Sequence, residues 1–252
     1  SFPTRRSSDL LNVDGSVTVT ITTTAASGAG GLITYSITAG SGSATLNPST
    51  GLLTGFSVGT VTLTVSSAGN TSYYSASTNQ VITINQTTPI LIVTSANTLN
   101  VDDTLATAVT TTASHDIGVI SYSMVNNTGA AIVDANTGLI RAFSAGTVTL
   151  TVSSAGNGDY APTSIDQSIT IGQATPTLTI TSSNSMNVDD NPTATVVTTA
   201  TFGRGGAITF SLTAGSGSAT VDPNSGSIVA ISVGTVTLTA SSPGDRDYNP
   251  AS

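Results

Sequence analysis

The feature that most constrains this sequence is an internal repeat of about 87 residues. The hexapeptide Gly-Thr-Val-Thr-Leu-Thr begins three times, with spacings of 87 and 88 residues, at Gly59, Gly146 and Gly234. The tripeptide Asn-Val-Asp recurs with spacings of 88 and 87 residues, from Asn12, Asn100 and Asn187. Two single positions keep the same register: an aromatic at Tyr35, Tyr122 and Phe210, and a glycine at Gly51, Gly138 and Gly226. The chain must therefore fold as about three copies of one unit.

Each copy has the pattern of short alternating strands, and the second copy is complete. We predict strands at residues 89–95, 107–112, 119–125, 130–133, 139–143, 147–153 and 167–171. In the sixth of these, Val148, Leu150 and Val152 should face the core, because successive side chains alternate between faces. Gly138 ends a hairpin loop in which a positive φ is expected. Seven such strands in about 87 residues predict an all-β chain of tandem immunoglobulin-like β-sandwiches.

Composition supports strands and excludes several partners. Only 7% of residues are charged, and Lys, Glu and Cys are all absent, which removes the strong charged helix formers, disulfides and thiolate metal sites. The net charge of −8 argues against nucleic acid, whose binding relies on clustered basic residues. The mean hydropathy is +0.24, yet no uncharged apolar run approaches the roughly 18 residues of a membrane helix, so we expect no membrane insertion.

Four segments of the second copy resemble bacterial immunoglobulin-like domains of group 2 type. They are Ile-Ser-Tyr-Ser from Ile120, Asp-Ala-Asn-Thr-Gly-Leu-Ile from Asp134, Ala-Gly-Thr-Val-Thr-Leu-Thr-Val-Ser from Ala145, and Ala-Gly-Asn-Gly-Asp-Tyr-Ala-Pro from Ala155. The resemblance covers residues 11–252. It implies stalk modules of intimin- and invasin-like adhesins or large secreted proteins, and an extracellular or bacterial cell-surface location. The family supplies spacers far more often than active sites.

The repeat register predicts the domain boundaries. Residues 1–10 match neither later copy and resemble a translated sequencing adapter. The first repeat is expected at 11–86 without its opening strand, the second at 87–173, and the third at 174–252. Since Pro162 corresponds to Pro250, the third repeat should lack a counterpart of residues 167–171. We therefore expect a fragment of a longer array, with the middle repeat the most stable.

The sequence contains no recognisable catalytic constellation, and we predict that the chain is not an enzyme. The sole histidine, His115, adjoins Asp116 in a loop, and we interpret the two as a solvated pair because no nucleophile or oxyanion site accompanies them. The glycine-rich stretches, such as residues 28–31, lack the helix that a phosphate cradle needs. Besides this loop, only Phe202-Gly203-Arg204 departs clearly from the repeat.

Asp and Asn residues in the turns are the one candidate ligand set. Asp134 and Asn136 are expected near Asn157 and Asp159, at the end of the repeat that faces the preceding one, and such oxygens suit Ca²⁺. Turn propensity explains the same residues without a metal, because Asp and Asn bond their own backbone. The analogues are Asp222, Asn224, Asp245 and Asp247 in the third repeat, and Asn47 and Asn70 in the first.

One tyrosine follows a turn in every copy, at Tyr73, Tyr160 and Tyr248. Its ring should cap the open end of the core while its hydroxyl reaches water or backbone; a platform for carbohydrate is the alternative.

Two functions remain, a structural spacer and a ligand- or carbohydrate-binding adhesive module. The joints at residues 85–88 and 172–175 are short, which favours end-to-end docking into a semi-rigid rod. Strands of about seven residues give modules near 40 Å and a rod on the order of 110 Å. The expected partners are neighbouring repeats of a monomeric chain, and a host or surface glycan or protein contacted through a larger parent protein.

Overall fold

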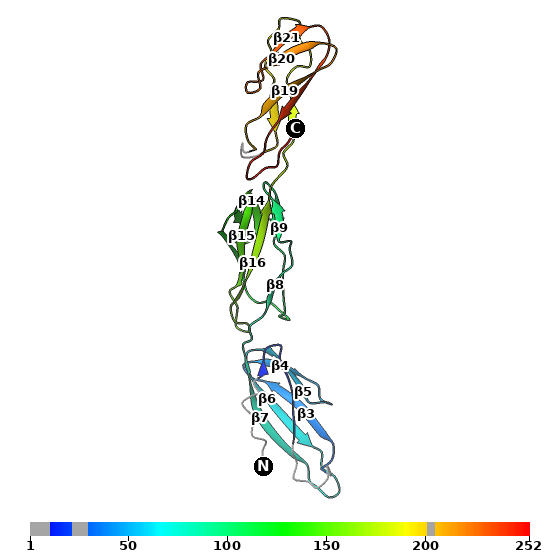
Figure 1. The fold of residues 1–252 in the computed structure, drawn as a ribbon. Helices are drawn as coiled ribbons and strands as arrows, with labels where there is room; N and C mark the ends of the chain where they lie inside the picture. Colours follow the sequence, from blue (N-terminus) through cyan, green and yellow to red (C-terminus); the bar gives the residue numbers. More distant parts are fainter. Residues whose placement is uncertain (1–10, 22–29, 201–204) are drawn as a thin grey trace. The chain divides into compact units, whose positions relative to one another are not determined.

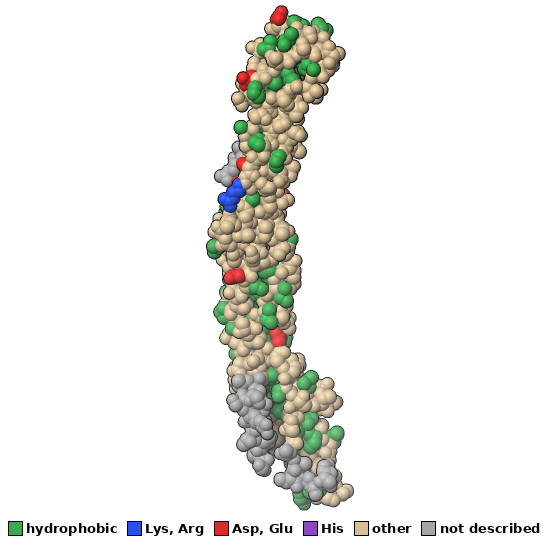
Figure 2. Space-filling model, viewed as in Figure 1, with side chains coloured by type: hydrophobic (Ala, Val, Ile, Leu, Met, Phe, Trp, Pro, Cys, Tyr) green, Lys and Arg blue, Asp and Glu red, His purple; other side chains and the backbone are tan. Residues whose placement is uncertain are grey.

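The computed structural model describes residues 11–21, 30–200 and 205–252, so the adapter-like segment and Phe202-Gly203-Arg204 lie outside the described residues. Those residues form strands and turns with no helix, and the chain is an all-β protein of immunoglobulin-like sandwiches (Figure 1). Within the described residues there is no helix that is long and apolar enough to cross a membrane. Side-chain charge is sparse on the face drawn in Figure 2.

Contacts divide the chain into two compact units that both include parts of the second repeat. The first unit comprises Ser1–Ile92, Val109–Ser121 and Val152–Ile165. The second comprises Val93–Ala108, Tyr122–Thr151 and Asp166–Ser252. Each unit therefore holds one of the two places where consecutive sequence repeats follow one another.

The first repeat is a sandwich of two sheets. One sheet has the order β1-β7-β6-β3 and the other has the order β2-β5-β4. β1 runs parallel to β7, whereas β3 and β7 are both antiparallel to β6. The strands are β1 (Leu11–Asn12), β2 (Ser16–Thr18), β3 (Ile33–Ala39), β4 (Ser43–Leu46), β5 (Leu52–Ser57), β6 (Gly59–Ser67) and β7 (Ala76–Asn85).

The second repeat has the same sheets, ordered β9-β16-β15-β12 and β10-β14-β13, with a further pair of β8 and β11. Its strands are β8 (Leu91–Val93), β9 (Thr98–Asn100), β10 (Thr104–Ala106), β11 (Val109–Thr111), β12 (Ile120–Asn126), β13 (Ala130–Val133), β14 (Leu139–Ser144), β15 (Gly146–Ser154) and β16 (Thr163–Gly172). β9 is parallel to β16, as β1 is to β7.

The third repeat contains three strand pairs, β17 with β18, β19 with β22, and β20 with β21. Among the described residues β22 has a strand partner on one side only, β19, followed by an isolated bridge between Ser242 and Ala251. The strands are β17 (Leu178–Ile180), β18 (Val196–Thr198), β19 (Thr209–Ala214), β20 (Ser218–Val221), β21 (Ile228–Ser232) and β22 (Val236–Ser241).

The core of the second repeat follows the predicted alternation. Val148, Leu150 and Val152 are each 0% exposed, which confirms their inward orientation. The number of strands was wrong, because the second repeat has nine and not seven. Its start is divided into β8 and β9, and Asp102, in a left-handed conformation with φ of 68°, turns the chain from β9 toward the additional strand β10.

A glycine in each copy makes room for the repeated aromatic ring. Gly138 has a φ of 69°, which confirms the positive φ predicted there, and a Cβ at this position would lie 2.8 Å from the Tyr122 ring. Gly51 and Gly226 have the same conformation against the rings of Tyr35 and Phe210. Since both the backbone and the ring exclude a side chain, the coupled recurrence of glycine and aromatic has a steric cause.

Candidate functional site

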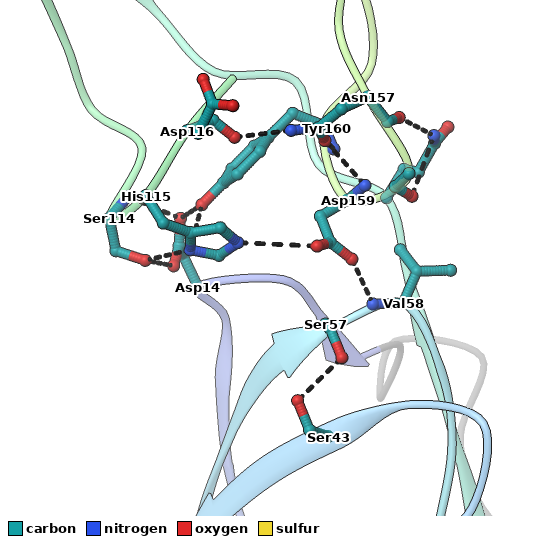
Figure 3. A network of polar contacts seen from close by, with 12 residues as sticks. Asp14, Ser43, Ser57, Val58, Ser114, His115, Asp116, Asn157, Asp159 and Tyr160 are labelled. Carbon is teal, nitrogen blue, oxygen red and sulfur yellow. Dashed lines mark hydrogen bonds and ion pairs between the residues drawn. The ribbon is translucent and has the colours of Figure 1, made fainter. Parts of the chain in front are cut away.

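The loop between β15 and β16 is a closed turn built by Asn157. The side-chain Oδ1 of Asn157 accepts hydrogen bonds from the backbone amides of Asp159 (2.8 Å) and Tyr160 (2.9 Å). The Asn157 amide donates in turn to the Tyr160 carbonyl at 2.9 Å. The turn therefore fixes both Asp159 and Tyr160, whose side chains contact the first repeat (Figure 3).

Tyr160 reaches an aspartate of the first repeat. Its side chain is 0% exposed, and its hydroxyl donates to Oδ2 of Asp14 at 2.6 Å. Asp14 follows β1 in a left-handed conformation, with φ of 61°, and also accepts bonds from the backbone amide (3.2 Å) and hydroxyl of Ser114. One carboxylate thus connects the first repeat to two loops of the second.

The ionisation of both partners reflects this contact. Burial raises the pKa of Tyr160, and the hydrogen bond to the Asp14 carboxylate raises it further. Burial alone would raise the pKa of Asp14, but the hydrogen bonds from Ser114 and Tyr160, with the nearby charge of His115, lower it on balance. The pair is therefore a neutral phenol that donates to an ionised carboxylate, a charge-assisted hydrogen bond.

Asp159 makes the second link to the first repeat. Its Oδ1 accepts the backbone amide of Val58, between β5 and β6, at 2.6 Å. The joint itself is also bonded: the Ala161 amide donates to the Thr87 carbonyl at 2.9 Å, and Nε2 of Gln86 donates to the Asn157 carbonyl at 3.0 Å. The residues that connect the two repeats are therefore fastened to the loop of the second.

His115 lies within this network, so the prediction of a solvated pair was wrong for the histidine, whereas Asp116 is exposed as expected. Its ring stacks on Phe56 of the first repeat with centroids 4.8 Å apart, and meets the Tyr160 ring edge-on at 4.9 Å. Its Nε2 is 3.6 Å from Oδ2 of Asp159, and its side chain is only 25% exposed. The ring was misjudged because Phe56 and Tyr160 are distant in sequence. Asp116 accepts the Gly118 amide at 3.0 Å and closes the same loop.

The second unit contains the same arrangement one repeat later. The hydroxyl of Tyr248, 1% exposed, donates to Oδ2 of Asp102 at 2.7 Å. Oδ1 of Asp247, 3% exposed, accepts the Ala145 amide at 2.8 Å and the Ser144 hydroxyl at 2.7 Å. The tyrosine link keeps its spacing, since Asp14 with Tyr160 and Asp102 with Tyr248 are each separated by 146 residues. The aspartate link spans 101 residues in the first unit and 102 in the second.

The details of the turn and the joint also recur. Oδ1 of Asp245 accepts the amides of Asp247 (2.8 Å) and Tyr248 (3.0 Å), as Asn157 does in the second repeat. Nε2 of Gln173 donates to the Asp245 carbonyl at 2.7 Å, and the Asn249 amide donates to the Ala174 carbonyl at 2.8 Å. We call this arrangement the junction: a plug loop (156–162 or 244–250) and a socket made of Asp14 and Val58, or of Asp102 and Ala145.

The first repeat carries the same plug loop with an exposed tyrosine. Oδ1 of Asn70 accepts the amides of Ser72 (2.9 Å) and Tyr73 (3.0 Å), so the turn forms in the same way. Tyr73 is nevertheless 39% exposed, against 0% and 1% for its two counterparts. The loop is therefore shaped by its own sequence, and contact with a preceding socket is what buries the tyrosine.

The structure changes the interpretation of the repeated tyrosines. Tyr160 and Tyr248 are buried, as a cap on the core should be, but their hydroxyls reach a carboxylate of the preceding repeat and not water or backbone. Rings without exposed faces cannot serve as a carbohydrate platform. The signal that sequence reasoning missed was the constant spacing between the Asn-Val-Asp aspartate and the tyrosine.

The expected calcium ligands have protein partners. Oδ1 of Asp134 accepts the amides of Asn136 (3.0 Å) and Thr137 (2.8 Å), and these bonds lower the pKa of Asp134. Asp222 has the equivalent bonds to Asn224 and Ser225. Asn157 and Asp159 make the turn and the contact with Val58 described above. Within residues 11–21, 30–200 and 205–252 no group of three or more acidic or histidine side chains is placed to hold a metal. The backbone bonds that Asp134 and Asp222 accept are the ones that the turn explanation predicts.

Comparisons with known proteins identify no family for the chain. No family model and no curated protein matches it. Human CDH23 EC21–23 is similar over 87% of this chain and 87% of its own, at 20% identity and a TM-score of 0.32. The protocadherin gammaB7 EC3–6 structure is similar over 87% of this chain and 67% of its own chain, at 12% identity and a TM-score of 0.31.

A bacterial protein shows a likeness of the same order. It is a SusE-like surface-located polysaccharide-binding protein of Bacteroides thetaiotaomicron, with 9% identity, 87% of this chain and 55% of that chain covered, and a TM-score of 0.28. At these TM-scores the likeness assigns no function to this chain.

The junction should weaken in acid. The pKa of Asp14 lies below its usual 3.8, so the bonds that its carboxylate accepts stabilise the folded chain above that pH and are lost as the pH falls through the lowered value. We expect Asp14→Asn to lower the melting temperature at neutral pH, and the difference from wild type to disappear as the pH falls below 3.8 and through the lowered pKa of Asp14. Asp134 and Asp222 titrate equally in both proteins, so the difference isolates Asp14. A difference independent of pH would contradict the assignment.

Proposed function

We propose that the chain is a non-catalytic spacer whose immunoglobulin-like repeats are coupled by the plug and socket junction. The observation that carries the proposal is the recurrence of the junction in both units with the same atoms in the same roles. The proposed modules are residues 11–86, 87–173 and 174–252. A repeat that makes both a plug and a socket extends in one direction without closing, which is the requirement of a stalk.

The bonding of the joints supports a stiff connection. Thr87 and Ala174 each make backbone bonds with the plug loop that follows them, and Gln86 and Gln173 reach the carbonyls of the same loops. A linker held at both its backbone and its side chain has few conformations left to explore. Neighbouring modules should therefore keep a constant orientation.

Scattering in solution tests this function. If the joints are stiff, small-angle X-ray scattering of the chain should give a narrow distribution of lengths with a maximum on the order of 110 Å, from modules of about 40 Å each. A compact particle, or the broad distribution of freely jointed modules, would contradict the spacer.

The location of such a spacer follows from the proposal. The repeats resemble bacterial immunoglobulin-like domains, and on that resemblance we propose that the chain is a stalk region of a secreted or bacterial cell-surface protein, of the kind found in intimin- and invasin-like adhesins. Its partners are then the neighbouring repeats of the same chain, and host or surface molecules are contacted through the parent protein.

The alternative of a carbohydrate-binding module has less support. Two of the three repeated tyrosines, Tyr160 and Tyr248, are buried in junctions. In the first repeat Tyr73 and Tyr74 are exposed, by 39% and 98%, but Tyr73 is the plug residue itself. We therefore retain the spacer as the function.

A further inference from the structure

The chain contains a single Asn-Gly pair, and it lies in the plug loop of the first junction. Asn157 and Gly158 are both exposed, and a Cβ on Gly158 would meet nothing within 4 Å. In such a pair the backbone nitrogen of the glycine can attack the side-chain carbonyl carbon of the asparagine, because glycine has no side chain to hinder the approach. The folded loop adds no steric obstacle of its own.

The surroundings of the Asn157 side chain also suit this attack. The amides of Asp159 and Tyr160 both donate to its Oδ1, at 2.8 and 2.9 Å, and its Nδ2 donates to the Asp116 carbonyl at 2.6 Å (Figure 3). Two amide donors on a carbonyl oxygen stabilise the negative charge that develops there when a nucleophile adds to the carbon. The Gly158 amide donates to no acceptor in the described part of the chain, so no hydrogen bond has to break before it attacks.

We propose that Asn157 is a site of spontaneous deamidation that loosens the first junction. The Gly158 nitrogen loses its proton to water and bonds to Cγ of Asn157. The bond from Cγ to Nδ2 then breaks, and Nδ2 takes up a proton and leaves as ammonia. Water opens the resulting five-membered succinimide: attack at Cγ gives aspartate, and attack at the backbone carbonyl carbon gives isoaspartate.

Isoaspartate at position 157 would displace the contacts with the first repeat. It adds one methylene group to the main chain at the start of the turn that fixes Asp159 and Tyr160. Asp159 accepts the amide of Val58. Tyr160 donates to Asp14. Lengthening the main chain at this turn therefore shifts both contacts together.

Aspartate at position 157 would be less well accommodated than it is in the third repeat. There Asp245 occupies the equivalent place, and its Oδ2 accepts the Gly205 amide at 2.8 Å. In the second repeat the corresponding atom is Nδ2 of Asn157, which donates to the Asp116 carbonyl. A carboxylate oxygen would face that carbonyl without a proton to share, and it would add a negative charge beside Asp116 and Asp159.

This inference rests on the proposed function, because it gives the spacer one joint that changes with age. The equivalent pair is Asp245-Arg246 in the third repeat and Asn70-Thr71 in the first, where the branched side chain of Thr71 hinders the attack. Deamidation should therefore act on the first junction and leave the second unchanged.

Peptide mapping by mass spectrometry of the whole chain, incubated at neutral pH, tests the site. Position 157 should gain the mass of deamidation, and become a substrate for isoaspartyl methyltransferase, about tenfold faster or more than position 70. Asn70 is a matched internal reference, because its Oδ1 closes the same turn. Gly158→Thr copies the first repeat and should abolish the modification, while the melting temperature of fresh protein stays nearly unchanged.

The effect on the junction is measured on the same samples. In aged wild type, the Val58 amide should exchange hydrogen faster than in fresh protein, and small-angle scattering should show a broader distribution of lengths. Aged Gly158→Thr should keep both properties of fresh protein. Asn157→Asp, measured fresh, isolates one product, and its Val58 amide should exchange at an intermediate rate.

Each part of the proposal can be overturned separately from the spacer. Equal rates at positions 157 and 70, or modification of position 157 in Gly158→Thr, would overturn the site. Modified chains whose Val58 amide exchanges as slowly as in fresh protein would overturn the effect on the junction. A failure of the spacer differs from both, because fresh, unmodified protein would already give the scattering of freely jointed modules.

Discussion

Replacing Tyr160 with alanine is expected to uncouple the first repeat from the second. The ring is fully buried, and its removal should cost about 3–5 kcal/mol of unfolding free energy, the range for large core aromatics. The hydroxyl bond to Asp14 is lost with it. Thermal or urea unfolding measures the loss, and small-angle scattering should show a broader distribution of lengths because the joint becomes mobile.

The chain offers a matched control for this variant. Tyr73 occupies the same position in the plug loop of the first repeat, with the same turn bonds from Asn70, but it is 39% exposed and makes no junction within the described part of the chain. Tyr73→Ala should cost no more than about 1 kcal/mol and leave the scattering profile unchanged. Equal effects of Tyr73→Ala and Tyr160→Ala would show that the ring serves its own repeat and not the junction.

A conservative variant separates the ring from the hydroxyl. Tyr160→Phe keeps the buried ring and removes only the donor to Asp14, so the expected cost is about 1 kcal/mol. Since Asp14 is partly exposed and also bonded by Ser114, water can replace the lost donor. Most of the effect of Tyr160→Ala should therefore come from the ring.

The repeat and the strands could be predicted from the sequence because they depend on local pattern. The alternation of apolar and polar residues correctly predicted that Val148, Leu150 and Val152 face the core. The sequence of the hairpin loop correctly predicted a positive φ at Gly138. The start of the second repeat could not be predicted in the same way. The apolar pattern at residues 89–95 does not indicate that the chain crosses from one sheet to the other after this segment. The left-handed conformation of Asp102, where the chain turns, cannot be read from the repeated Asn-Val-Asp motif alone.

The junction could not be predicted from the local sequence pattern, for a different reason. Asp14 and Tyr160 are separated by 146 residues, and the tyrosine was expected to cap the core of its own repeat. Nothing in a single repeat shows that the carboxylate of one copy meets the phenol of the next. The recurrence of the same separation between Asp102 and Tyr248 is the one signal that points to it, because two residues that interact across copies must keep their offset.

A glycine follows the socket residues Val58 and Ala145, and its replacement is expected to have the second large effect on stability. Gly146 has a φ of 136°, a region that side chains rarely adopt, and a Cβ placed on it would lie 2.4 Å from the Gly129 amide nitrogen. Gly59 and Gly234 have the same conformation. The tight approach of the two backbones also orients the preceding amide, that of Ala145, toward the carboxylate of Asp247 at 2.8 Å.

Gly146→Ala is therefore expected to destabilise the second repeat and its junction with the third together. The strained φ and the backbone clash should cost more than about 3 kcal/mol, and the displaced Ala145 amide should weaken the bond to Asp247. Chemical unfolding measures the first effect, and hydrogen exchange at Ala145 measures the second. Gly158→Ala is the control, because a Cβ there meets nothing within 4 Å, and its cost should stay within about 0.5 kcal/mol. If Gly146→Ala were as mild as Gly158→Ala, the backbone could relax, and the glycine would not be needed to shape the socket.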